Sequence, residues 1–486
     1  MLIESLFHHA QRQPHALAII DDQGQCSYRQ LALMAAGFAK YIASQTNFGR
    51  VGLLLPSGRG FVASFYGTLL AGKAVVPINF LLGGAEIAHC IRDSGIDTVV
   101  TIPQLAGAVE KMGLKIVDLT RLPVAPEAEL PSLPSTAADA MAVLMYTSGT
   151  SGLPKGVPLT YDNLQSDVDA AIAYMDFQTR HKFLGIIPLF HVFGMIAMML
   201  APIQLGATTV YMSRFSPVGA VKAIREHGIS LVLGVPSMFA AMARLKEASS
   251  DDFKTVFAMI SGGEPLPATL YEAFRSRFGV TLFQAYGMTE TSLAISVNTP
   301  QQQKAGSVGK PIPGMQVVFL DDEGNASRSG EPGEICVKGQ MVMKGYFNLP
   351  AENAAAFTPD GYYKTGDIGM LDSDGFLHIT GRKKDLIIIA GEKAAPAEIE
   401  QILMTHPGVA EAAVVGMKDA SRGEVVLAFI IPREGCSPTL EDIREFCRQQ
   451  GLAQWKAPRE IRVVRDFPRS PTGKVLKRVL AQSAGE

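Results

Sequence analysis

Apolar runs rich in β-branched residues alternate with helix-like stretches through the first half of the chain. These runs are VGLLLP at 51–56, AVVPINF at 74–80, DTVVTI at 97–102, TTVYM at 208–212 and SLVLGVP at 230–236. Because strands buried on both faces read as continuous apolar runs, the alternation predicts an α/β fold with βα units around two largely parallel sheets. A chain of 486 residues exceeds what one hydrophobic core supports, so several cores are expected.

The pattern changes beyond residue 306. Short strands and turn signals such as Asp374-Gly375 predict a small β-barrel-like subdomain at about 306–381. After it, PAEIEQILMTHPGV and LEDIREFCRQQG show helical periodicity on either side of the strand-like run VVLAFIIP. We therefore expect a large N-terminal domain over residues 1–383 and a small α+β C-terminal domain over residues 384–486.

Charge and composition exclude several classes of protein. A formal net charge of −2, without a block of like charges, argues against nucleic-acid binding by phosphate neutralisation. The five cysteines are scattered and form no CxxC pair, which favours reduced thiols in the cytoplasm. Residues 183–213 carry no formal charge and are long enough to cross a bilayer, but Pro188, Gly194, Pro202 and Gly206 interrupt them, so no membrane span is expected.

The segment YTSGTSGLPKGV at 146–157 has the composition of a phosphate-binding loop. Its glycines allow successive N–H groups to point into one concavity, and its hydroxyl groups and lysine add donors and positive charge. A Walker loop requires Ser or Thr directly after the lysine, whereas Gly156 follows Lys155 here. ATP is therefore the first ligand to consider, with a flexible Ser/Gly linker as the alternative. The candidate phosphate ligands are Thr147, Ser148, Gly149, Thr150, Ser151 and Lys155.

Seven further segments follow in order. They are PLFHVFG at 188–194, SGGEPLP at 261–267, YGMTET at 286–291, GSVGKPIPG at 306–314, YYKTGDIG at 362–369, GRKKDLIIIAGEK at 381–393 and PRSPTGKVLKR at 468–478. With the phosphate loop they resemble the signatures of the adenylate-forming superfamily of acyl- and aryl-CoA synthetases, non-ribosomal peptide adenylation domains and luciferases. The resemblance is strongest to acyl-CoA synthetases. It implies that a carboxylate and ATP form acyl-AMP, and that a thiol then displaces AMP.

Adenylation brings a carboxylate to the α-phosphate, so positive charge and hydrogen-bond donors must be fixed where negative charge builds up. Lys474 is the candidate for bridging the two anions, and by resemblance it is the family's catalytic lysine. The resemblance also implies that Tyr286 stacks on adenine, that Thr289 binds the α-phosphate and that Glu290 holds Mg²⁺. The last role suits a single carboxylate shared with phosphate oxygens, although a glutamate at a helix N-terminus has the same pattern.

Two further groups of residues complete the expected nucleotide site. Asp367 is expected to accept hydrogen bonds from the ribose hydroxyls, with Arg382 adding to that grip, although a turn residue explains Asp367 equally simply. Small residues allow the backbone to pass close to the adenine or the acyl group. The backbone candidates are Gly263, Gly287 and Met288, together with Glu264, which directly follows Gly263.

The acid substrate is predicted less directly. His191 lies in an apolar neighbourhood, where we expect a neutral side chain that positions or gates the substrate and does not act as an obligatory base. The resemblance implies that an amino-acid-activating member would have an Asp early in this region to pair with the substrate ammonium. No acidic residue occurs at 183–213, so a fatty or other apolar acid is favoured over an amino acid. A core-packing helix explains the methionines of this region equally well. The candidate substrate-binding residues are His191, Phe193, Met195, Met198, Gly262, Gly287 and Met288.

The second step needs a thiol acceptor, for which the resemblance implies coenzyme A. By resemblance Lys384 is the hinge on which the small C-terminal domain moves, and Gly391 and Lys393 belong to a strand and loop that approach the pantetheine. Delivery to the phosphopantetheine of an acyl carrier protein is the alternative, and aryl-CoA ligation is a variant of the main prediction. A catalytically inactive ATP-binding scaffold is the non-enzymatic alternative, and either a monomer or a homodimer is expected.

Overall fold

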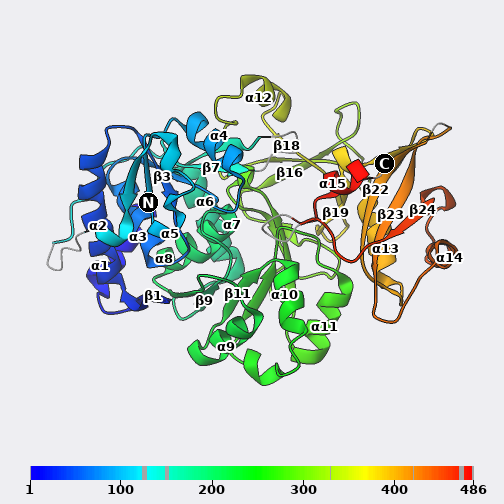
Figure 1. The fold of residues 1–486 in the computed structure, drawn as a ribbon, viewed down its shortest axis with the longest axis horizontal. Coiled ribbons are helices and arrows are strands. Elements are labelled where there is room, and N and C mark those ends of the chain that lie inside the picture. Colours follow the sequence, from blue (N-terminus) through cyan, green and yellow to red (C-terminus); the bar gives the residue numbers. More distant parts are fainter. Residues whose placement is uncertain are drawn as a thin grey trace.

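The computed structural model describes residues 2–122, 129–147, 153–328, 330–419, 421–469 and 475–483 (Figure 1). Its largest sheet has nine strands in the order β15-β14-β13-β12-β11-β9-β10-β1-β2. The strands from β1 to β13 in this order are parallel, and β2, β14 and β15 add antiparallel edges. Their bounds are β1 Leu17–Asp21, β2 Gly24–Ser27, β9 Lys182–Gly185, β10 Thr208–Tyr211, β11 Leu231–Gly234, β12 Ala258–Ser261, β13 Leu282–Gly287, β14 Ala294–Val297 and β15 Lys310–Pro311.

A second sheet has six strands in the order β6-β5-β3-β4-β7-β8. It is parallel except for the β7–β8 hairpin, whose strands are antiparallel. The bounds are β3 Arg50–Leu54, β4 Ala74–Pro77, β5 Thr98–Thr101, β6 Lys115–Asp118, β7 Met141–Thr147 and β8 Lys155–Thr160. The apolar runs of the sequence form β3, β4, β5, β10 and β11, which confirms the prediction of two βα-type sheets.

Two antiparallel or mixed sheets follow in the last third of the chain. A four-stranded sheet runs in the order β16-β17-β18-β19, where the sequence predicts a small β-barrel-like subdomain. A five-stranded sheet has the order β21-β20-β23-β22, with β24 paired to β23. The bounds are β16 Gln316–Leu320, β17 Gly333–Lys338, β18 Tyr363–Leu371, β19 Leu377–Arg382, β20 Ile387–Ile389, β21 Glu392–Ala394, β22 Val409–Asp419, β23 Gly423–Pro432 and β24 Glu460–Val463.

Helices cover these sheets, as Figure 1 shows. The α-helices are α1 Leu2–Arg12, α2 Tyr28–Gln45, α3 Arg59–Leu70, α4 Gly84–Ser94, α5 Pro103–Ala106, α6 Tyr161–Met175, α7 Val192–Met195, α8 Ala201–Leu205, α9 Pro217–His227, α10 Pro236–Ala243, α11 Ala268–Phe278, α12 Pro350–Ala356, α13 Pro396–Thr405, α14 Leu440–Gln449 and α15 Lys477–Ser483. The short 3₁₀ helices are η1 Glu110–Met112, η2 Leu119–Arg121, η4 Ser250–Phe253, η5 Thr289–Thr291, η6 Lys383–Asp385 and η7 Gln454–Lys456, and η3 Ile196–Leu200 is a π-helix between α7 and α8.

Local sequence explains where α6 begins. The Thr160 hydroxyl accepts a hydrogen bond from the Asn163 N–H at 3.1 Å, and the Asn163 side chain accepts one from the Thr160 N–H at 2.9 Å. This reciprocal capping satisfies two donors that the first turn leaves unpaired. It starts α6 directly after β8, so the helix leads from the predicted phosphate hairpin into the core.

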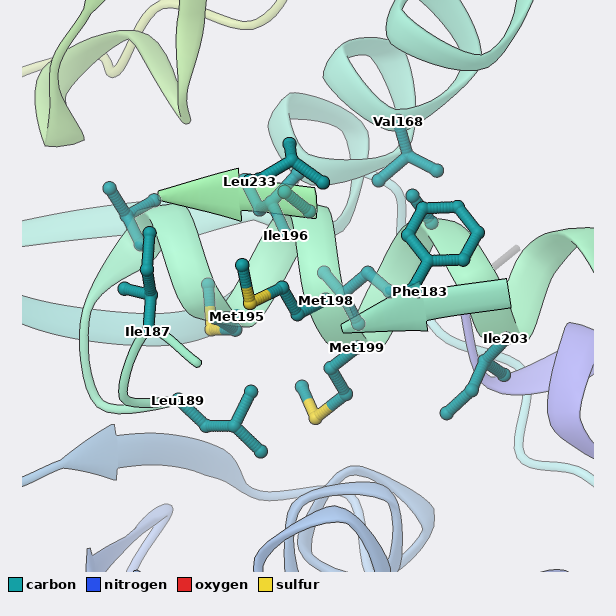
Figure 2. Packing of buried hydrophobic residues seen from close by; sticks show 14 of the residues in the cluster. Val168, Phe183, Ile187, Leu189, Met195, Ile196, Met198, Met199, Ile203 and Leu233 are labelled. Carbon is teal, nitrogen blue, oxygen red and sulfur yellow. The ribbon is translucent and has the colours of Figure 1, made fainter. Parts of the chain in front are cut away.

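The uncharged segment 183–213 packs inside the protein. It forms β9, α7, η3, α8 and β10 in succession, and Figure 2 shows its methionines packed among Phe183, Val168 and Leu233. Within the described residues, we find no helix that combines the length and the apolar character needed to cross a membrane. This agrees with the interrupted pattern of the sequence.

The hydrophobic side chains beyond residue 386 form cores of their own. One cluster includes Ile399, Val414 and Ile443, and a smaller one includes Phe467 and Leu480. The largest cluster draws on the chain from Leu2 to Leu377. This separation supports, as a proposal, a division into residues 1–383 and 384–486. In Figure 1 the five-stranded sheet lies at the opposite end of the molecule from α1 and α2.

Candidate active site

Three predicted nucleotide-binding residues from two different sheets meet at Asp367. Asp367 on β18 lies opposite Arg382 on β19, and the Arg382 Nε is 2.9 Å from Asp367 Oδ1. The hydroxyl of Tyr286, at the end of β13, donates to Asp367 Oδ2 at 2.7 Å. Asp367 is only 3% exposed. Burial, reinforced by the nearby Asp367, raises the pKa of Tyr286 far above its ordinary value, so the phenol remains a hydrogen-bond donor.

Glu290 lies beside this group on the turn η5, directly after β13. The turn requires glycine at position 287, because a Cβ there would lie 1.6 Å from the backbone oxygen of Leu293. The Tyr346 hydroxyl donates to Glu290 Oε1 at 3.0 Å. Burial raises the pKa of Glu290, whereas the Tyr346 hydrogen bond and the positive charges of Lys155 and Arg382 act in the opposite direction. Glu290 therefore lies within electrostatic reach of both Lys155 and Arg382.

Lys155 begins β8, opposite Thr147 on β7, so the β7–β8 hairpin carries both ends of the predicted phosphate loop. The Lys155 Nζ lies 5.1 Å from the centre of the Tyr346 ring. The structure thus brings Lys155 and Glu290 to the same tyrosine. The loop candidates Ser148, Gly149, Thr150 and Ser151, and the predicted catalytic Lys474, lie outside the described residues, and their roles stay predictions.

The remaining backbone candidates lie on turns at the ends of strands. Met288 precedes η5 and Thr289 begins it, and both are partly exposed. Gly263 follows β12 with φ +83°, a conformation that favours glycine, and the partly exposed Glu264 comes next. These turns follow β12 and β13, which are neighbours in the nine-stranded sheet, so they meet at the same edge.

The predicted acid-binding residues separate into two groups. Phe193 lies against Gly262, because a Cβ at position 262 would be 3.3 Å from Phe193 Cε1. Met195 and Met198 are instead 0% exposed and belong to the largest core. Figure 2 shows both side chains among other apolar side chains. Their position agrees with the core-packing interpretation, which the sequence left open.

His191 precedes α7, and its Nε2 is buried without a hydrogen-bond partner among the described residues. Burial lowers the pKa of His191 to about 4. The imidazole is therefore neutral near pH 7, as expected from its apolar neighbourhood. A neutral imidazole can position a substrate group by one hydrogen bond.

The predicted hinge and acceptor residues lie at the start of the five-stranded sheet. Lys384 lies on η6, and desolvation by the surrounding protein lowers its pKa. Lys393 forms an ion pair with Asp322, in the loop after β16. Gly391 has φ +92° and borders a cleft of about 700 Å³ with Arg422. The β20–β21 hairpin is thus attached to the four-stranded sheet's loop, and its role toward an acceptor stays a prediction.

Two residues that contact this site or the segments beside it were not among the sequence predictions. Tyr346 contacts both Glu290 and Lys155, although its Gly-Tyr-Phe segment has no chemical signature of its own. Asp167 on α6 is 0% exposed and accepts a hydrogen bond from the Ala294 N–H at 2.9 Å. Burial raises the pKa of Asp167 to about 7. The sequence around Asp167 offers no clear signal, because Ser166 precedes it and a second acid, Asp169, lies two residues later.

Comparison with known proteins identifies the family. The family of AMP-binding enzymes matches residues 6–347, and the C-terminal domain of AMP-binding enzymes matches residues 398–474. The chain belongs to the AMP-binding enzyme family. This membership confirms the resemblance to the adenylate-forming superfamily.

Relatives of this AMP-binding enzyme act on diverse acids according to their names. A sulfoacetate–CoA ligase from Cupriavidus necator is 34% identical, over 91% of this chain and 89% of its own length. A long-chain-fatty-acid–CoA ligase from Bacillus subtilis is 32% identical, over 90% of this chain and 86% of its own. The structure of o-succinylbenzoate CoA synthetase from Bacillus subtilis, in complex with ATP and magnesium ion, has a TM-score of 0.87 at 31% identity, covering 98% of both chains.

Proposed function

We propose that this AMP-binding enzyme is an ATP-dependent carboxylic acid:CoA ligase that forms an acyl-AMP intermediate and then an acyl-CoA thioester. One observation carries the proposal: the buried Asp367, held by Arg382 and Tyr286, lies beside Glu290 and Lys155, which share Tyr346. Acceptors for a ribose and cations for phosphates thus occur together. The names of the relatives, all CoA ligases or synthetases, support the same reaction.

Different residues bind different parts of the nucleotide. Asp367 accepts hydrogen bonds from the ribose hydroxyls, and Tyr286 and Thr289 contact the adenine and the α-phosphate. Lys155 neutralises the outer phosphates. Among the described residues, no cluster of three or more His, Cys, Asp and Glu side chains forms a metal site by itself. A single buried glutamate, Glu290, still fits Mg²⁺, which is commonly bound by one or two carboxylates plus phosphate oxygens and which supplies charge neutralisation there.

Both steps are substitutions, in which one bond forms as another breaks. In the first, a carboxylate oxygen forms a bond to the α-phosphorus while the bond to pyrophosphate breaks. In the second, the thiol gives up its proton and its sulfur forms a bond to the acyl carbon while the bond to AMP breaks. We assign the bridging cation of the first step to Lys474. The hinge Lys384 and the segment with Gly391 and Lys393 serve the second step.

The acid is proposed to be fatty or otherwise apolar. No acidic residue occurs at 183–213 to pair with an amino group. The neutral His191 has a buried nitrogen that is available for hydrogen bonding, and the apolar Phe193 lies against Gly262. These uncharged groups suit a carboxylate with an uncharged chain or ring.

The test is pyrophosphate exchange into ATP with graded fatty and aryl acids, followed by product analysis with CoA or a carrier protein as acceptor. We expect exchange that depends on an apolar acid, and a thioester of CoA. Lys474→Ala should abolish exchange but largely spare thioester formation from supplied acyl-AMP. Absence of acid-dependent exchange across the panel would refute the ligase and favour a scaffold, and a product formed only with the carrier protein would replace CoA as acceptor.

A further inference from the structure

Tyr346 contacts both Glu290, which is proposed to bind Mg²⁺, and Lys155, which is proposed to meet the outer phosphates. Its hydroxyl donates to Glu290 Oε1 at 3.0 Å, and its ring lies 5.1 Å from the Lys155 Nζ. We propose that Tyr346 is a positioning residue that fixes Glu290 for magnesium and Lys155 for the outer phosphates of ATP. The inference rests on the proposed function, because that function gives Glu290 and Lys155 their ligands.

The tyrosine is itself held from both sides of its backbone. The Asn353 side chain accepts a hydrogen bond from the Tyr346 N–H at 2.6 Å and donates one to its carbonyl at 2.9 Å. The next residue, Phe347, donates its N–H to the Gly156 carbonyl at 2.8 Å. Gly156 directly follows Lys155 on β8. The segment carrying Tyr346 is therefore anchored to the strand that begins with Lys155.

A chain of hydroxyl groups links Glu290 to the strand of the ribose-binding residue. The Tyr363 hydroxyl lies 3.0 Å from that of Tyr346. Because the Tyr346 proton is directed to Glu290, Tyr363 donates to the Tyr346 oxygen. Tyr363 begins β18, the strand that carries Asp367. Tyr363 is buried and Tyr346 is partly buried, so water has limited access to these hydrogen bonds.

The two contacts of Tyr346 act in different ways. The hydroxyl occupies Glu290 Oε1 and favours the charged carboxylate, which orients the other oxygen for a cation. The ring attracts the ammonium of Lys155 through its negative face. Removing the hydroxyl alone should therefore affect the magnesium requirement, and removing the ring as well should also affect phosphate binding without magnesium.

The experiment measures ATP binding by calorimetry over a range of Mg²⁺ concentrations, without acid substrate, so no turnover is needed. For Tyr346→Phe we expect the Mg²⁺ concentration for half-maximal ATP binding to rise about tenfold, while Mg²⁺-free ATP binding stays unchanged. For Tyr346→Leu we expect the same rise and, in addition, an affinity for Mg²⁺-free ATP that is about fivefold weaker. AMP affinity should be unchanged in both variants.

Tyr362 offers a matched control in the adjacent position to Tyr363. Its hydroxyl donates to Gln316 at 3.0 Å, and the Lys338 Nζ lies 5.5 Å from its ring centre. It thus makes the same two kinds of contact, but with residues outside the proposed nucleotide site. Tyr362→Phe and Tyr362→Leu should leave every binding constant unchanged.

Three results would overturn the inference. They are an unaltered Mg²⁺ requirement in Tyr346→Phe, a parallel loss of AMP affinity in both Tyr346 variants, which would indicate general damage to the site, and an equal effect of the Tyr362 variants. A failure of the proposed function is distinguished from a failure of this inference by an assay of the wild-type protein. If the proposed function is wrong, the wild-type protein shows no acid-dependent pyrophosphate exchange. Normal exchange by wild type with unaltered Tyr346→Phe binding would reject the role of Tyr346 alone.

Discussion

Replacement of Asp367 by Asn tests the proposed ribose site with a change of one functional group. Asp367 is 3% exposed, and its two oxygens accept from Arg382 at 2.9 Å and Tyr286 at 2.7 Å. An amide removes the charge and places an N–H₂ group where one of these donors, or a ribose hydroxyl, requires an acceptor. Loss of one hydrogen bond to a charged group costs about 1.5–3 kcal/mol, which corresponds to roughly 10- to 150-fold in affinity.

The assay is calorimetric binding of AMP without Mg²⁺, because AMP contains the ribose but not the outer phosphates. We expect Asp367→Asn to weaken the affinity for AMP by at least about tenfold. Asp372→Asn is the matched control, since Asp372 lies at the end of the same sheet and accepts from His378 while pairing with Lys304. Wild-type affinity in Asp367→Asn, or an equal loss in Asp372→Asn, would refute the reasoning.

Three further predictions concern buried ionisable groups. Glu290→Gln should raise the Mg²⁺ concentration needed for pyrophosphate exchange at least about tenfold and leave AMP binding intact; an unchanged Mg²⁺ requirement would contradict the metal role. The folded-state pKa of His191 is depressed to about 4, so its contribution to stability is present above about pH 6.5 and is lost as pH falls toward 4. Between about pH 6.5 and 4.5, the free energy of unfolding of His191→Gln, measured in urea, should therefore fall by about 2 kcal/mol less than that of wild type. Equal decreases in the two proteins would argue against a buried imidazole. The folded-state pKa of Asp167 is raised to about 7, so its contribution is present near pH 4 and is lost as pH rises through 7. From about pH 5 to 7.5, the free energy of unfolding of Asp167→Asn should rise by about 2 kcal/mol relative to that of wild type. A parallel pH dependence of the two proteins would show that Asp167 is hydrated.

Strands and motif positions were predictable because their signals are local. The run SLVLGVP forms β11, and TTVYM forms β10, since apolar β-branched residues between turns have few alternatives. The order of the motifs likewise predicted that Tyr286 and Asp367, 81 residues apart, belong to one site. That prediction came from the resemblance, because no local rule determines which distant strands meet.

Other features depended on contacts that periodicity does not encode. The pattern of Met195 and Met198 fits a ligand slot and a packed helix equally, and only the surrounding strands and helices of the core distinguish them. Tyr346 became apparent from its contact with Glu290, 56 residues away. The depressed pKa of His191 arises from burial by other elements, so the sequence could indicate its neutral state but not its extent.

The central claim, that this enzyme activates an acid as its adenylate before a thiol displaces AMP, is tested most directly by isotope transfer. An accepted acid labelled with ¹⁸O in its carboxylate is incubated with ATP, Mg²⁺ and CoA, and the AMP is analysed by mass spectrometry. The account predicts that one ¹⁸O from each acid molecule appears in the phosphate of AMP, because the oxygen that attacks the α-phosphorus leaves with it. Unlabelled AMP, or ADP and labelled inorganic phosphate in its place, would contradict the account.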